Sequence, residues 1–129
     1  FSVYGKHHHN IISIIKNRIA NDEPLTIYGD GTQTRAFSHV LDICEATKII
    51  MNNEASFGEA YNLSGPKEYS VNELVDLLSE HFGNRPKIEY KKAGVDELQR
   101  NIADTSKIQS LGFSFQHSLE EFIRSEWNS

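Results

Sequence analysis

The stretch that decides the fold is residues 24–42, which read PLTIYGDGTQTRAFSHVLD. The residues at 25–28 predict a short strand, and the glycines at positions 29 and 31 predict a turn, because glycine adopts positive φ angles without steric cost. A polar loop that carries Arg35 is expected next, and a helix is expected to begin near His39. This stretch therefore predicts a strand, a turn and a cationic loop that lead into a helix.

The same stretch contains residue types that suit an anionic ligand. The guanidinium group of Arg35 presents five donors in one plane and can contact phosphate oxygens in pairs, and Tyr28 can offer its ring to a nucleobase. A helix N-terminus near His39 would add its dipole to an anion site. The competing interpretations are that Arg35 only faces solvent or pairs with a carboxylate, and that His39 only caps the helix. The pattern alone leaves these alternatives open.

Apolar residues at helical spacing predict helices on both sides of this stretch. The expected helices cover residues 10–20, 40–52 and 70–82, a short segment that Asp104 caps, and a last segment from residue 118. Ser70 with Glu73 forms a capping-box pattern, which Ser118 and Glu121 repeat. Gly83 stands where a left-handed cap is expected. The chain should therefore contain four or five helices.

Short strands are expected over residues 1–5, 25–28, 60–63 and 87–90. Four or five helices with three or four short strands indicate the α/β class, but these strands are too few for a complete doubly wound sheet. The 129 residues suit a single domain or part of one. Because the chain opens inside an expected core strand, we expect residues 1–129 to form one truncated domain.

The charge of the chain argues against a nucleic-acid surface. The formal net charge is −5, from 13 Lys and Arg against 18 Asp and Glu, whereas nucleic-acid binders carry clustered basic residues. No apolar run approaches the length of a membrane span, and no signal-peptide pattern is present. A cytoplasmic protein with a small ligand fits these observations.

Other reactive side chains have plain structural interpretations. The single cysteine, Cys44, excludes a disulfide framework within the chain, and its place on the apolar face of a helix predicts a small buried side chain rather than a nucleophile. The histidines at 7–9 are expected to form a solvated loop rather than a metal site, because metal ligands normally come from separated positions. Asp42 and Glu45 stand in the first turn of a helix, where acidic groups usually complement the dipole.

Residues 25–42 resemble the substrate-binding signature of the extended short-chain dehydrogenase/reductases, approximately P-L-x-I-Y-G-D-G-x-Q-x-R-D-F-x-x-V-x-D. That family includes UDP-glucose 4-epimerases, dTDP-glucose 4,6-dehydratases and UDP-glucuronate decarboxylases. Further segments resemble family motifs in the same order: FSVYG at 1–5, GEAYNLSG at 58–65, SVNEL at 70–74, ADTSK at 103–107, LGF at 111–113 and SLEE at 118–121. The resemblance covers the whole chain and implies the C-terminal, substrate-binding portion of such an enzyme, without a complete Rossmann sheet.

The resemblance also implies roles for particular residues. Arg35 matches the family arginine that contacts the diphosphate of a bound sugar nucleotide. Ile27 and Tyr28 match the segment that lines the base pocket. We therefore expect these three residues to lie together at a nucleotide site.

A second nucleotide-binding segment of the family precedes the ADTSK motif and contains an arginine and an aspartate. Here Lys92 replaces the arginine, and Asp96 or Glu97 supplies the acid, depending on the register. A lysine keeps the charge but lacks the planar guanidinium group. The resemblance therefore implies a nucleotide site with one weakened half.

Two family elements are missing from this sequence, the G-x-x-G-x-x-G turn that cradles a dinucleotide and the catalytic Tyr-x-x-x-Lys. The resemblance implies that NAD and the catalytic groups belong to another portion of the parent enzyme. We therefore expect no catalytic residue and no cofactor within this chain, which should be inactive alone. A 4-epimerase is the expected parent, with a 4,6-dehydratase or a decarboxylase as open alternatives.

The expected partner is a nucleotide-diphosphate sugar. The helices over residues 10–20 and 40–52 would pack partly on the portion that holds NAD, so their apolar faces also predict a homodimer or strand exchange. A non-catalytic sugar-nucleotide-binding or protein-interaction module that retains the fold is the alternative function.

Overall fold

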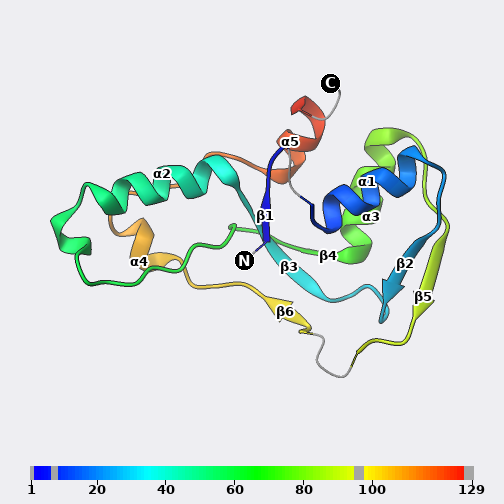
Figure 1. Ribbon diagram of the computed structural model, residues 1–129, viewed down its shortest axis with the longest axis horizontal. Helices are drawn as coiled ribbons and strands as arrows, with labels where there is room; N and C mark the ends of the chain where they lie inside the picture. The colour runs from blue at the N-terminus through cyan, green and yellow to red at the C-terminus, as the bar shows by residue number, and fades with distance from the viewer. Residues whose placement is uncertain (1, 7–8, 95–97, 127–129) are drawn as a thin grey trace.

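The computed structural model describes residues 2–6, 9–94 and 98–126, which form an α/β chain (Figure 1). The helices are α1 (Ile11–Ala20), α2 (Val40–Met51), α3 (Val71–Phe82), α4 (Ser106–Gln109) and α5 (Leu119–Glu126), with a 3-10 turn η1 (Glu54–Ser56). The strands are β1 (Ser2–Tyr4), β2 (Leu25–Tyr28), β3 (Thr34–His39), β4 (Glu68–Ser70), β5 (Ile88–Lys91) and β6 (Arg100–Asn101). The expected class, with helices and few short strands, is confirmed.

Strand β3 is the hub of the larger sheet. Its C-terminal half pairs in parallel with β1, with Phe37 opposite Ser2. Its N-terminal half lies between β4 and β6, with Arg35 opposite both Tyr69 and Asn101. A separate parallel pair joins β2 to β5. The sheet is therefore small and open, and Arg35 stands where three strands meet.

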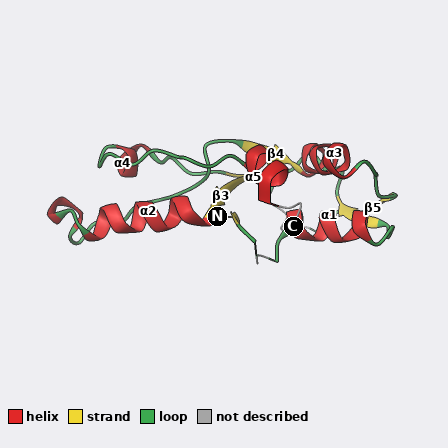
Figure 2. Cartoon of the chain, turned by 90° about the horizontal axis from the view of Figure 1, so that it is seen from above, coloured by secondary structure: helices red, strands yellow, loops and turns green. Residues whose placement is uncertain are grey.

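The elements divide between two ends of the molecule. Helices α2 and α4 lie at one end, whereas α1 and α3 with the β2–β5 pair lie at the other (Figures 1 and 2). Strand β3 runs between these ends and leads directly into α2. Among the described residues, no helix has the length and apolar character that crossing a bilayer requires.

The main core lies between α1 and α3. Asn10 caps α1 by accepting the amides of Ile12 and Ser13, and the Ser13 hydroxyl accepts the Asn10 amide in return. The buried face of α1 carries isoleucines at positions 12, 15 and 19, and it packs in the same apolar cluster as Leu74 and Leu78 of α3. Helix α3 therefore covers this face of α1, and the partial packing of α1 on another portion of the enzyme stays a prediction.

The described residues cover helix α2 on one side only. Ala46 packs against Ile108 and Phe113 in a second, smaller cluster. Leu41 and Met51 lie elsewhere on the helix and are 53% and 74% exposed. Cys44 is exposed as well, so its expected burial is wrong. The helix turns Asp42 and Ala46 inward, and Cys44 points roughly 200° away from Asp42 because successive residues advance by about 100°.

Two expectations about strands are also wrong. The stretch around Arg35, expected as a polar loop, is strand β3, whose pairing partners are all distant in sequence. Residues 60–63, expected as a strand, join no described ladder. Tyr61 and Leu63 instead pack as half-buried side chains on the second cluster. Long-range pairing explains both differences, since it fixes strands that local patterns cannot reveal.

Candidate functional site

A cleft of about 300 Å³ opens between β2, the start of α1, the N-terminal half of β3 and the start of α3. Its lining includes Ile27, Tyr28 and Arg35, which the sequence analysis selected, together with Gln33 and Ile11. Tyr28 is 55% exposed, so its ring is accessible to a ligand. The structure therefore brings together three of the predicted site residues.

Arg35 is the cation of this cleft. Its side chain is half-buried, and one guanidinium nitrogen, Nη1, donates to the carbonyl of Thr34 at 2.7 Å. None of the ion pairs within the described residues involves Arg35. The remaining donors of a guanidinium group held in this way suit an anion better than a neutral ligand.

The turn between β2 and β3 is held by its own side chains. The Asp30 carboxylate accepts the amide of Thr32 at 3.0 Å and its hydroxyl at 2.6 Å, and these hydrogen bonds lower the pKa of Asp30. The Gln33 side-chain amide donates to the carbonyl of Tyr28 at 2.9 Å. Gly29 and Gly31 adopt φ angles of 83° and 79°, as the sequence predicts for a turn that only glycine forms easily. Tyr28 and Arg35 thus flank an ordered connection.

The second expected nucleotide-binding segment is only partly described. Lys92 is exposed and follows β5, whose Lys91 lies opposite Tyr28. The amide of Gly29 donates to the carbonyl of Lys91 at 2.8 Å. Lys92 therefore lies near the turn but does not line the cleft. Asp96 and Glu97 lie outside the described residues, as do two of the histidines at 7–9, while His9 is exposed.

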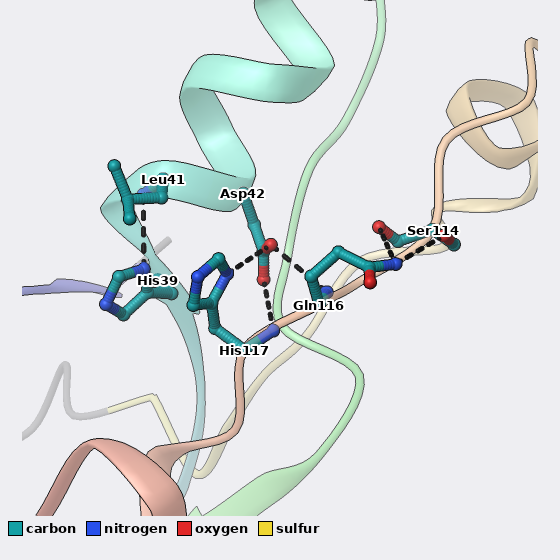
Figure 3. Close-up of polar contacts among 6 residues, drawn as sticks. All are labelled: His39, Leu41, Asp42, Ser114, Gln116 and His117. Carbon is teal, nitrogen blue, oxygen red and sulfur yellow. Dashed lines mark hydrogen bonds and ion pairs between the residues drawn. The ribbon is translucent and has the colours of Figure 1, made fainter. Parts of the chain in front are cut away.

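His39 lies apart from the cleft, at the opposite end of β3 from Arg35. Its Nδ1 accepts the amide of Leu41 at 3.2 Å, which caps α2 (Figure 3). The ring is buried and stacks on His117, with centroids 4.2 Å apart. Of the two interpretations that the sequence left open, the structure favours capping over phosphate contact.

Asp42 has a structural role that the sequence pattern did not indicate. Its carboxylate accepts the backbone amides of Gln116 and His117, at 3.1 and 3.3 Å, and the imidazole Nδ1–H of His117 at 2.8 Å (Figure 3). The side chain is 3% exposed. One signal was available, because Asp42 shares the inward face of the helix with Ala46. It is a structural anchor rather than a dipole partner alone.

Metal ligation finds no support among the described side chains, because no three or more of their His, Cys, Asp and Glu groups are arranged to hold an ion. The cleft is therefore described by a cation, an aromatic ring and an apolar floor. This combination suits a phosphorylated ligand with a planar group.

The chain is similar to known proteins in both sequence and structure. Residues 1–64 match the sequence model of the NAD dependent epimerase/dehydratase family. A Methanocaldococcus jannaschii protein named "putative UDP-glucose 4-epimerase" is 34% identical over 128 residues, which are 95% of this chain and 41% of that protein. UDP-glucuronic acid 4-epimerase from Bacillus cereus, solved in complex with UDP-glucuronic acid and NAD, superposes with a TM-score of 0.90 at 28% identity. The chain belongs to the NAD dependent epimerase/dehydratase family.

The relatives of this chain are named for more than one activity. UDP-glucuronic acid decarboxylase 1 of Arabidopsis thaliana is 31% identical over 112 residues, which are 84% of this chain and 25% of that protein. The superposition on the Bacillus cereus epimerase covers 99% of this chain and 42% of that enzyme. The chain thus spans well under half the length of each of these family relatives.

Proposed function

We propose that this chain forms the nucleotide-binding side of the substrate site in an NAD-dependent enzyme that converts UDP-sugars. The cleft that joins Arg35 to Tyr28 is the observation that carries the proposal. Arg35 binds the diphosphate, and Tyr28 with Ile27 contacts the base. The names of the relatives support a uridine diphosphate sugar as the substrate class.

In this proposal the chain contributes binding energy rather than chemistry. Contacts with the diphosphate and the base hold the sugar in place although they do not touch it. Binding energy from such remote groups orients the reacting centre. The sequence of 129 residues contains neither the glycine-rich dinucleotide turn nor a Tyr-x-x-x-Lys. We therefore assign NAD binding and proton transfer to residues outside this chain, which is inactive by itself. Epimerisation at C4 is the proposed reaction, ahead of dehydration or decarboxylation.

The test is the affinity for UDP, measured by calorimetry on wild type and Arg35→Lys. Lysine keeps the charge but removes the planar pair of donors, so we expect about a tenfold weaker Kd. Arg85→Lys is the matched control, because Arg85 pairs with Asp76 on the exposed side of α3. Equal affinities for wild type and Arg35→Lys, or an equal loss in the Arg85 variant, contradict the assignment of Arg35.

A second candidate, an interaction module that forms a homodimer, is favoured by the outer side of α2. Leu41, Cys44 and Met51 lie at spacings of three and seven residues, so they share one stripe of the helix. All three are exposed. We propose that this stripe buries itself against a second copy of the chain when no other portion of the protein covers it.

A further inference from the structure

Asn72, the second residue of α3, bonds twice to the turn between β2 and β3. Its backbone amide donates to the carbonyl of Gly31 at 3.1 Å, and its side-chain Nδ2 donates to the carbonyl of Asp30 at 3.0 Å. Helix α3 and the turn are far apart in sequence and meet at these two bonds. Asn72 is the third residue of the SVNEL segment at 70–74, and the local pattern there does not indicate a role for it.

The contact between Asn72 and Gly31 is tight. A Cβ atom on Gly31 would lie 2.2 Å from Oδ1 of Asn72, and the φ angle of Gly31 is 79°. The amide group of Asn72 therefore packs directly on the main chain of the turn. A side chain at position 31 would have to displace it.

Helix α3 is a fixed support for this contact. Ser70 and Glu73 cap its first turn reciprocally, and Leu74, Val75 and Leu78 anchor it in the main core. A side chain on the first turn of such a helix has a defined position. The two hydrogen bonds from Asn72 thus fix the turn relative to the core.

The turn between β2 and β3 sets the distance between Tyr28 and Arg35 in the cleft. Tyr28 precedes it and Arg35 follows it, and both line the cleft. Asn72 does not line the cleft itself. We propose that Asn72 is a positioning residue that holds Tyr28 and Arg35 at the separation a nucleoside diphosphate requires. This inference rests on the proposed function, and it adds a residue that acts through the turn.

The test compares Asn72→Ala with Asn84→Ala in calorimetric titrations with UDP. Asn84 is exposed beyond the end of α3. Both substitutions replace one uncharged side chain by another, so neither alters the electrostatic field at the diphosphate. Loss of a neutral hydrogen bond and of a preorganised turn predicts that Asn72→Ala weakens UDP binding about fivefold, whereas Asn84→Ala binds like wild type. Amides of residues 29–33 should also exchange faster in the ligand-free Asn72→Ala variant than in the control.

A double variant separates positioning from general destabilisation. If Asn72 acts through Arg35, Asn72→Ala should cost little further affinity in the Arg35→Lys background. The inference is overturned if Asn72→Ala binds UDP like the control, or if its full effect persists in that background. If wild type does not bind UDP at all, the proposed function fails and takes this inference with it. Faster exchange at residues 29–33 would then still show that Asn72 holds the turn.

Discussion

The carboxylate of Asp42 accepts the imidazole Nδ1–H of His117 at 2.8 Å, across 75 positions of sequence. Two backbone amides of the same segment reach the same carboxylate. Asp42 lies in the first turn of α2, and His117 lies two residues before the start of α5. This one side chain therefore ties the start of α2 to the segment that places α5 against the core.

Asp42→Asn should be strongly destabilising. The asparagine amide keeps one acceptor oxygen but places an NH2 group where the Gln116 amide, the His117 amide and the His117 ring all donate. Buried donors therefore lose their acceptor, and we expect the free energy of unfolding to fall by about 2–4 kcal/mol. Asp76→Asn is the control, because its pair with Arg85 is exposed and such pairs contribute about 0–1 kcal/mol. Urea unfolding of both variants measures the difference, and equal midpoints would refute the anchoring role.

Gly65→Ala should destabilise the chain through a steric clash. A Cβ atom at Gly65 would lie 1.8 Å from the carbonyl oxygen of Phe37, in the backbone of β3. Forcing it in costs about 1–3 kcal/mol or more. Gly94→Ala is the matched control, since, chain neighbours aside, no atom of the described residues lies within 4 Å of a Cβ there. Thermal unfolding that shows the same Tm for both variants would contradict the close packing of residue 65 on β3.

Stability should fall at alkaline pH because of Tyr69. Burial and the hydrogen bond to Glu120 at 2.7 Å raise the pKa of this phenol. The folded state therefore keeps the proton while the unfolded state releases it, and stability is lost as pH rises above about 10. Tyr69→Phe removes the hydrogen bond to Glu120, which lowers stability at neutral pH. The variant has no phenol to ionise at this position, so it also lacks this source of instability at alkaline pH. Urea unfolding between pH 7 and 11 should show the gap between wild type and Tyr69→Phe shrinking above pH 10, and a constant gap would count against the assignment.

Self-association should depend on the outer stripe of α2. Light scattering over a range of concentrations should show a dimer for wild type and a monomer for the double variant Leu41→Ser with Met51→Ser, because the apolar stripe is lost. Leu98→Ser is the control, since Leu98 is exposed outside that helix. A wild type that stays monomeric at every concentration would eliminate the homodimer.

The helices were predictable because their signals are local. The capping box of Ser70 and Glu73 and the left-handed cap at Gly83 occur where the sequence places them. Strand β3 was not predictable in the same way. Its partners are residues 2–4, 68–70 and 100–101, and no local pattern contains that information.

The candidate site shows the same division between local and long-range information. The turn chemistry placed Tyr28 and Arg35 on either side of one connection, and the structure joins them in one cleft. The anchoring role of Asp42 and the contact of Asn72 with the turn depend on packing between distant segments. His39 stood near Arg35 in sequence, but an extended strand carries it to the other end of β3.

The location of the nucleotide site is tested most directly by mapping backbone amide resonances during titration with UDP-glucose. We predict perturbations concentrated at residues 26–35 and at the first turn of α3, with resonances around His39 and His117 unchanged. Perturbations centred on His39 and His117, or none at saturating ligand, would contradict it.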